Sequence, residues 1–291
     1  MISSYFNIKK WCLAFCLLCI TFVQAQKPVN STMNIDKTTR HYSKNDTLIT
    51  VVWSTGKGSI GTLQLDLGNK RPLFKSIQLN GKGFNKTIAQ NLDPAFILTV
   101  GKRDLVSQNG WNIFFDKVPK KPFKSYTVDF DKRNATVTTE GSQTIIRVGQ
   151  MQSASFTGVL EITLYDGSPL FNVASVLSTN IDSTAILYDA GLVSKTPVWN
   201  NIAWSDTKNE LQTAIANQSD TSKNLEVKYR TIIGETDGGS LAVFPAPHQY
   251  FYPLDEAFNL KFTWYGSNYR KMIPEFGMGI RQDLYLSLIH I

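Results

Sequence analysis

The sequence has few residues that hold metals or form covalent cross-links: three cysteines and three histidines in 291 residues. The cysteines are Cys12, Cys16 and Cys19. All three lie in a stretch that we interpret below as a removable signal, so the mature chain can form neither a disulfide bond nor a thiolate metal site. The histidines are His41, His248 and His290. This set excludes a histidine-rich metal cluster and, without a cysteine, a Cys-His nucleophile in this fragment.

The chain also lacks a concentrated charge of one sign. Removing the two lysines of the signal from the 30 basic residues leaves 28 against 23 acidic residues. The basic residues are scattered through the turns and form no run that interleaves with aromatics. Recognition of phosphates by charge needs a concentrated basic face, so we predict no nucleic-acid partner.

No apolar run is long enough to favour a membrane span. Residues 1–25 combine two lysines, the apolar run from Trp11 to Val23 and a cleavage site that ends at Ala25, which is the pattern of a secretion signal. A lipoprotein signal would need small residues before a cysteine, whereas Phe15 precedes Cys16 and Leu18 precedes Cys19. We therefore expect an exported protein, periplasmic or extracellular, with no membrane span after removal of the signal.

We interpret the last six residues, Leu286 to Ile291, as a sequencing-adapter scar. With one choice of codons, the DNA that encodes these six residues has the sequence of the transposon end that is used to fragment DNA for sequencing libraries. We expect the natural chain to continue beyond Tyr285, with its true continuation missing. An intact gene that ends in the same six residues would contradict this interpretation.

The stretch from Gly158 to Leu192 predicts its structure most firmly. Apolar and polar residues alternate from Leu160 to Tyr165, residues 166–169 (Asp-Gly-Ser-Pro) form a turn, and Leu170 to Leu177 returns as a second strand. This is a β-hairpin with one face in a large core.

Similar strand signals continue through most of residues 46–285, after a polar lead-in arm at 26–45. Roughly a dozen or more strands are too many for a seven-stranded immunoglobulin sandwich. They predict an all-β domain, a large two-sheet antiparallel sandwich with at most one short helix, at Thr207 to Asn217. The alternative is two smaller sandwiches divided near residues 117–124.

From the hairpin (ITLYDGSPLFNVASVLST) to AILYDAGL and on to Trp264, the pattern resembles the galactose-mutarotase-like supersandwich. That resemblance implies an amino-terminal, assisting domain of a secreted bacterial carbohydrate-active enzyme, ahead of a separate catalytic domain. Mutarotases use paired histidines and a catalytic glutamate at the sugar. Neither His41 nor His248 matches such a motif, so no catalytic residue carries over.

The loop within Pro245 to Trp264 is the first candidate for ligand binding. A sugar site needs an aromatic platform for the ring and polar groups for its hydroxyls, and this loop supplies both. The candidates are His248, Gln249, Tyr250, Tyr252, Asp255 and Glu256. The alternative is that the loop simply covers one end of the sandwich. Asp255 and Glu256 are adjacent and would point to opposite faces of a strand, so they do not form a facing acid/base pair.

Three further residues are candidate ligand contacts. Trp199 and Trp204 lie in a predicted aromatic loop, whereas Trp264 lies on the apolar side of an alternating strand and is predicted to be core. Arg281 could hold a carboxylate in bidentate fashion, either on a sugar acid or on the protein itself, and a contact between domains is an equal alternative.

The remaining acidic residues identify no catalytic pair and no metal site. Asp93, Asp104, Asp116 and Asp189 are available as carboxylates, but the sequence does not say which of them converge. The turn acids lack the spacing of a calcium loop. We predict no cofactor. The sequence does not decide whether a structural calcium ion bridges separate loops.

Three functions are consistent with these patterns. The first is an exported, non-catalytic accessory domain of a larger glycan-processing enzyme. The catalytic domain of that enzyme would follow downstream in the same chain and is missing from this fragment. The second is a stand-alone carbohydrate-binding module. The third is a periplasmic structural or adhesion domain without a ligand.

Overall fold

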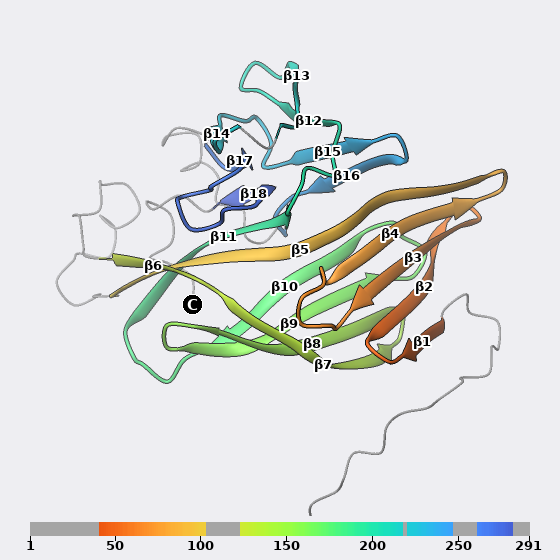
Figure 1. The fold of residues 1–291 in the computed structure, drawn as a ribbon, viewed down its shortest axis with the longest axis horizontal. Helices are drawn as coiled ribbons and strands as arrows, with labels where there is room; N and C mark the ends of the chain where they lie inside the picture. The colour runs from red at the N-terminus through yellow and green to blue at the C-terminus, as the bar shows by residue number, and fades with distance from the viewer. Residues whose placement is uncertain (1–40, 103–122, 218–219, 247–260, 282–291) are drawn as a thin grey trace, which may run out of the picture. The chain divides into compact units, whose positions relative to one another are not determined.

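A computed structural model describes residues 41–102, 123–217, 220–246 and 261–281 (Figure 1). These residues all belong to one compact unit, Ile35–Ile291. The described part of the chain contains eighteen strands and no helix. Every ladder between these strands is antiparallel, which confirms the predicted all-β sandwich.

Sheet 1 has ten strands in the order β1-β2-β3-β4-β5-β11-β18-β17-β14, with β6 paired to β5. Its strands are β1 (His41–Asn45), β2 (Leu48–Gly56), β3 (Ser59–Asp66), β4 (Phe74–Gly81), β5 (Phe84–Lys102), β6 (Phe123–Thr127), β11 (Thr184–Ser194), β14 (Lys223–Leu225), β17 (Thr263–Gly266) and β18 (Phe276–Arg281). The last five residues of the predicted polar arm therefore form β1, which pairs with β2.

Sheets 2 and 3 have four strands each. Sheet 2, in the order β10-β9-β8-β7, consists of β7 (Asp129–Glu140), β8 (Gln143–Ser153), β9 (Phe156–Tyr165) and β10 (Phe171–Ser178). Sheet 3, in the order β13-β12-β15-β16, consists of β12 (Asn201–Ser205), β13 (Leu211–Ile215), β15 (Ile232–Thr236) and β16 (Gly239–Val243). The predicted hairpin is β9 and β10, which confirms both strands and the turn between them.

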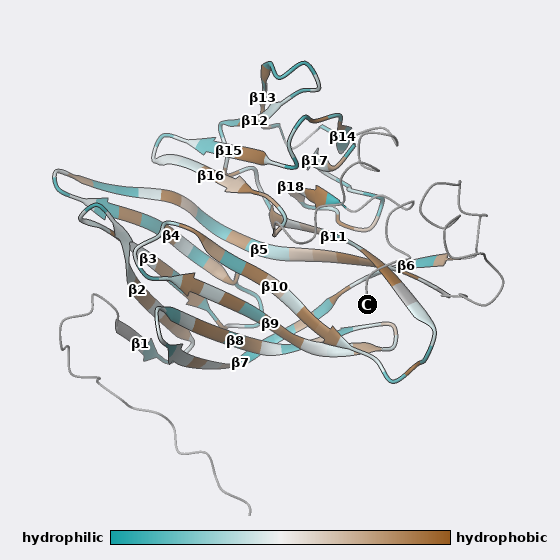
Figure 2. Cartoon of the chain, turned by 180° about the vertical axis from the view of Figure 1, so that it is seen from behind, coloured by the Kyte–Doolittle hydropathy of each residue, from teal (hydrophilic) through white to brown (hydrophobic). Residues whose placement is uncertain are grey.

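The core lies between sheet 1 and the other two sheets. In β2, every second residue is buried, so that Ile49, Val51 and Trp53 face inwards, as the period of a strand requires. They share one apolar cluster with Leu160 and other residues of sheet 2, and with residues of sheet 3. Figure 2 shows hydrophobic segments recurring along the strands of these sheets. The two-layer sandwich thus has a second layer that is divided in two.

A buried lysine ties sheet 2 to sheet 1. Lys132 in β7 donates to the backbone carbonyl of Arg71, in the segment between β3 and β4. Its Nζ also lies 3.8 Å from Oδ1 of Asp93 in β5. Burial lowers the pKa of Lys132, and the charge of Asp93 opposes that shift. The contacts of Lys132 therefore join the two layers of the sandwich. They do so although the burial of a charged group costs free energy.

Two sequence predictions were wrong. The residues predicted as a helix, Thr207 to Asn217, contain strand β13, and the predicted aromatic loop contains strand β12. Leu211, Ala214 and Ile215 fit a helical face, but residues 211–215 also alternate in exposure, and pairing with β12 selects the strand. A short apolar pattern cannot by itself separate the two periods.

Candidate functional site

A buried carboxylate, Asp189, lies at the centre of a polar cluster on sheet 1. Asp189 is in β11, directly between Ile97 of β5 and Arg281 of β18. Its exposed fraction is only 3%. A buried carboxylate requires hydrogen bonds and opposite charges around it, and the neighbouring strands and one loop supply both.

Both oxygens of Asp189 are engaged. Oδ1 accepts a hydrogen bond of 3.0 Å from the Tyr269 hydroxyl, and Oδ2 accepts one from Nη1 of Arg270. Nε of Arg281 lies 3.9 Å from Oδ1, which makes an ion pair but not a hydrogen bond. Burial raises the pKa of Asp189, and the two guanidinium groups oppose that shift. We name this group, with Thr99 and Ser125, the Asp189 cluster.

Two hydroxyl groups complete the cluster beside Arg270. Nη1 of Arg270 donates to Thr99 Oγ1 at 3.2 Å, and Nη2 donates to Ser125 Oγ at 2.8 Å. The two hydroxyl oxygens are themselves 2.8 Å apart. They come from the paired strands β5 and β6, where Thr99 and Ser125 are register partners. The Arg270 side chain is 26% exposed and that of Arg281 17%, so the cluster reaches solvent along its arginines.

A tight loop between β17 and β18 carries Tyr269 and Arg270. Its backbone is closed by a hydrogen bond of 2.9 Å from the Tyr269 amide to the Ile273 carbonyl. Three residues of this loop, Asn268, Arg270 and Lys271, have positive φ angles of 57°, 52° and 58°. Such a conformation disfavours residues with a Cβ by about 1 kcal/mol or more. The cluster therefore holds Arg270 in place against local strain.

The indole of Trp264 stacks on Tyr269 of the Asp189 cluster and packs against glycine residues. Trp264 stacks on Tyr269 with ring centroids 3.9 Å apart and an interplanar angle of 7°. A Cβ on Gly191, Gly277 or Gly279 would come within 2.8 Å of Trp264 atoms. Only residues without a side chain leave room for the indole here. Burial and the charge of Asp189 raise the pKa of Tyr269, so its hydroxyl stays protonated and donates to the carboxylate.

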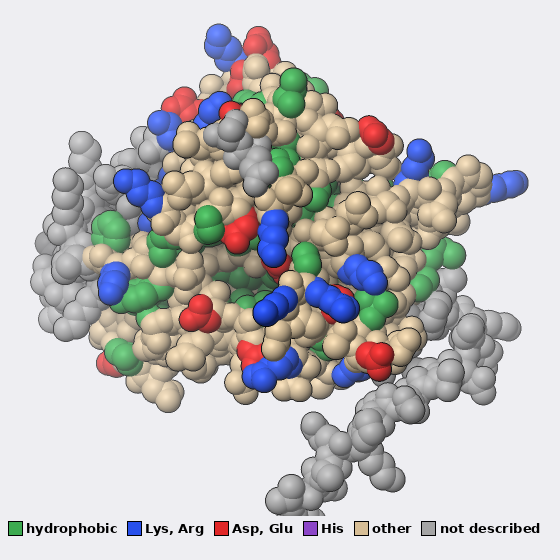
Figure 3. Space-filling view, viewed as in Figure 1, with side chains coloured by type: hydrophobic (Ala, Val, Ile, Leu, Met, Phe, Trp, Pro, Cys, Tyr) green, Lys and Arg blue, Asp and Glu red, His purple; other side chains and the backbone are tan. Residues whose placement is uncertain are grey.

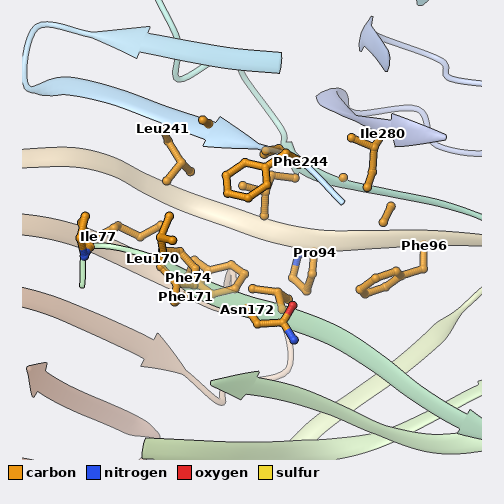
Figure 4. A pocket seen from close by; sticks show the side chains of 17 residues that line it. Phe74, Ile77, Pro94, Phe96, Leu170, Phe171, Asn172, Leu241, Phe244 and Ile280 are labelled. Atoms are coloured by element: carbon orange, nitrogen blue, oxygen red, sulfur yellow. The ribbon is translucent and has the colours of Figure 1, made fainter. Parts of the chain in front are cut away.

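An apolar cleft with a cavity volume of about 170 Å³ lies on the other face of the same strands. Asp189 and Ala190 are successive residues of β11 and point to opposite sides of sheet 1. Ala190 lines the cleft with its register partners Phe96 and Ile280. Figure 4 shows Leu241 and Phe244 on one side, Leu170, Phe171 and Asn172 on the other, and Pro94 and Phe96 between them.

The second buried carboxylate is also engaged by the protein. Asp66 accepts hydrogen bonds from the Thr47 hydroxyl at 3.0 Å, the Gly68 amide at 2.9 Å and Nη1 of Arg71 at 3.2 Å. Burial alone would raise the pKa of Asp66, but these hydrogen bonds outweigh it, and the pKa lies below its ordinary value. The ionised carboxylate of Asp66 therefore fixes the end of β3.

The lowered pKa of Asp66 predicts an acid-dependent contribution to stability. Its contribution is complete above the unfolded-state pKa of about 4 and is lost as the pH falls through the lower, folded-state pKa. We expect Asp66→Asn to lower the free energy of unfolding by about 1 kcal/mol at pH 7. The difference from the wild type should shrink as urea unfolding is repeated at decreasing pH below about 4. A difference that stays constant down to pH 2 would contradict this assignment.

The structure places three of the nine predicted ligand contacts; the other six, His248, Gln249, Tyr250, Tyr252, Asp255 and Glu256, lie outside the described residues. Trp199 is 3% exposed, and its ring lies against Gly234, where a Cβ would come within 2.4 Å. It is a core residue and not an exposed platform. Trp204 is half-buried and packs on Tyr265 at 5.8 Å. Arg281 pairs with a carboxylate of the protein itself, Asp189. Trp264 is fully buried, as predicted.

Sequence reasoning did not single out Tyr269 and Arg270. No local pattern marks them, because their role depends on a loop that brings them to a strand far away in the chain. Asp189 did carry a signal: it is a charged residue inside an otherwise apolar strand, AILYDAGL. A charge at such a position requires a partner in the fold.

Within residues 41–102, 123–217, 220–246 and 261–281, no three His, Cys, Asp or Glu side chains come together as a metal site. No helix in the same ranges has the length and apolar character needed to cross a membrane. A comparison with models of known protein families found no match, and neither did a comparison with curated proteins.

Proposed function

We propose that the chain is an exported, non-catalytic β-sandwich domain of a larger glycan-processing protein, and that it contacts a glycan at the exposed edge of the Asp189 cluster. The observation that carries the non-catalytic role is the state of the buried carboxylates. Asp66 and Asp189, the two buried acids of the described residues, use both oxygens in contacts with the protein. Because Asp66 and Asp189 are only 4% and 3% exposed, neither carboxylate is within reach of a sugar, as proton transfer or nucleophilic attack would require.

The composition of the cluster supports glycan contact. Its solvent edge combines the guanidinium group of Arg270 with the hydroxyl of Ser125, which is half-buried. Polar groups held in fixed positions are the groups that orient a ligand such as a sugar through its hydroxyls. The resemblance to the galactose-mutarotase-like supersandwich supports the same role, because such domains accompany catalytic domains in secreted enzymes.

Calorimetry on the full mature chain tests the glycan contact. We expect one member of a broad set of oligosaccharides to bind, and Arg270→Gln to weaken it about tenfold, equivalent to about 1.4 kcal/mol. Arg133→Gln is the matched control, because Arg133 pairs with Asp131 at an exposed position away from the cluster. Trp199→Ala is not a suitable probe, since it removes a core residue.

Two outcomes would count against the proposal. Affinity for no oligosaccharide would favour a structural or adhesion domain without a ligand. Reading the uninterrupted gene tests the parent protein: a natural stop near Tyr285 would contradict a downstream catalytic domain. If sugar binding persisted in that short protein, the chain would instead be a stand-alone carbohydrate-binding module.

The surface charge agrees with a partner other than nucleic acid. On the face in Figure 3, Lys and Arg side chains are interspersed with Asp and Glu side chains and form no continuous basic area. Among the described residues, the exposed Arg147 pairs with the half-buried Glu161 at 2.9 Å, so that its positive charge is offset locally. A mixed surface of this kind does not concentrate the positive charge that phosphate recognition needs.

A further inference from the structure

Two strand edges face the same apolar cleft. Strand β10 is the last strand of sheet 2, and β16 is the last strand of sheet 3. Residues 169–173, which lead into and begin β10, line the cleft together with residues 241–244 at the end of β16. Figure 4 shows them on opposite sides, with β5 of sheet 1 passing between them. Sheets 2 and 3 therefore cover the same face of sheet 1, with the cleft between their edges.

Each edge has hydrogen-bonding groups that no other described strand uses. β10 pairs only with β9, and β16 pairs only with β15, within the described ranges. No backbone hydrogen bond to a further described segment starts or ends in either strand. An unpaired edge presents a row of N–H and C=O groups that favours the addition of a strand.

Neither edge carries the features that usually prevent such pairing. Proteins protect strand edges with charged residues, bulges or prolines. Strand β7, at the other end of sheet 2, has several charged residues and a bulge, and the end strands β1, β6 and β14 of sheet 1 each carry a lysine. The strands β10 (FNVASVLS) and β16 (GSLAV) contain no charged residue, no proline and no bulge. Among the other end strands of the described sheets, only β13 also lacks charged residues and prolines, and it does not line the cleft.

The lining of the cleft is uncharged as well. Of the seventeen lining residues, Asn172 has the only polar side chain, and the others are apolar, proline or glycine. Two large apolar side chains remain open to solvent there: Leu170 is 54% exposed and Phe244 is 47% exposed. The cleft offers almost no side-chain partner for the hydroxyls of a sugar. An uncharged strand could instead bury apolar side chains against sheet 1 and form hydrogen bonds with the two backbone edges.

We propose that this cleft binds an extended polypeptide strand from a protein partner, with uncharged residues facing sheet 1 and backbone hydrogen bonds to β10 and β16. The added strand would join sheets 2 and 3 where the start of β10 and the end of β16 line the cleft. This is β-augmentation with two receiving edges instead of one. The inference does not depend on glycan binding, which lies on the opposite face of sheet 1.

A peptide-binding experiment on the full mature chain tests the proposal. The probes are a set of synthetic peptides of about eight residues, the length of a typical strand, in which alternate positions vary among Ala, Val, Leu, Phe, Thr and Tyr. We expect a subset to bind in fluorescence anisotropy and to protect backbone amides of both β10 and β16 from hydrogen exchange. N-methylation of alternate residues of a binding peptide should abolish binding, because it removes the donors that pair with a strand edge.

Variants with matched controls locate the site. Leu170→Asp and Phe244→Asp replace the two exposed apolar side chains of the lining, one on each wall, with a charge, and each should weaken the peptide at least about tenfold. Leu211→Asp and Ile215→Asp are the controls, since both are exposed large apolar side chains of β13, which does not line the cleft. These controls should bind within about twofold of the wild type.

Several results would overturn the proposal. They are an absence of binding across the peptide set, equal binding of the N-methylated peptide, and protection of one strand only. An apolar small molecule that binds in place of every peptide would make the cleft a simple hydrophobic pocket. Protection of both edges by self-association, without peptide, would make the occupant a second copy of this chain.

Discussion

Trp264→Ala is expected to lower the free energy of unfolding by about 3–5 kcal/mol, the range for removal of a fully buried aromatic side chain. The indole has no exposed surface and stacks on Tyr269. The three glycines that make room for it cannot fill the space left behind, because they have no side chains to rearrange. The loss thus includes a cavity term as well as the lost burial. Urea unfolding followed by circular dichroism measures the change.

The same change should reach the Asp189 cluster. Without the indole, Tyr269 loses its stacking partner, and its hydroxyl is no longer held at 3.0 Å from Asp189. Trp264→Ala and Tyr269→Phe should therefore be non-additive, since both weaken the same hydrogen bond. Trp264→Phe, which keeps an aromatic ring, should cost clearly less. Simple additivity, or a loss below about 1 kcal/mol for the alanine variant, would contradict this packing.

Gly158→Ala is the second change with a large expected effect. Gly158 in β9 pairs with Leu177 in β10, and a Cβ there would lie 1.9 Å from the carbonyl oxygen of Val176. The methyl group meets backbone and not a flexible side chain, so the two strands must separate. We expect a loss of about 3 kcal/mol, at the upper end of the usual cost of overpacking.

Thr157→Ala is the control for Gly158, because Thr157 is its exposed neighbour in the same strand. Urea unfolding should separate the two variants, and hydrogen exchange should show faster exchange in β9 and β10 of Gly158→Ala alone. Since β10 forms one wall of the apolar cleft, Gly158→Ala should also weaken peptide binding. A stable variant with unchanged exchange would show that the hairpin tolerates a side chain at this position.

The two faces of sheet 1 at β11 differ in chemistry because side chains alternate along a strand. Asp189 places its charge on one face, and Ala190 contributes apolar surface to the other. Glycan contact is proposed for the first face and a polypeptide strand for the second. A single domain could in this way hold a sugar and a protein partner at the same time, with one strand positioning both sites.

The amino-acid pattern alone determined the all-β class and the hairpin of β9 and β10. Alternation of apolar and polar residues carries that information within each segment, as from Leu160 to Tyr165, and it also predicted that Trp264 is core. At residues 207–217 the same kind of evidence failed. Leu211, Ala214 and Ile215 fit a helix and a strand almost equally well, and only pairing with β12 decides between them.

The tertiary structure alone decided which polar groups meet. Asp189, Arg270 and Arg281 come from β11, a loop and β18, and their convergence depends on strand order and register. The same holds for Trp199, which is buried because Gly234 leaves space for its ring. The facing edges of β10 and β16 are likewise a property of how two sheets lie on a third. Local periodicity records which side of a strand is buried, but contacts between distant segments depend on packing and register, which no short stretch of sequence contains.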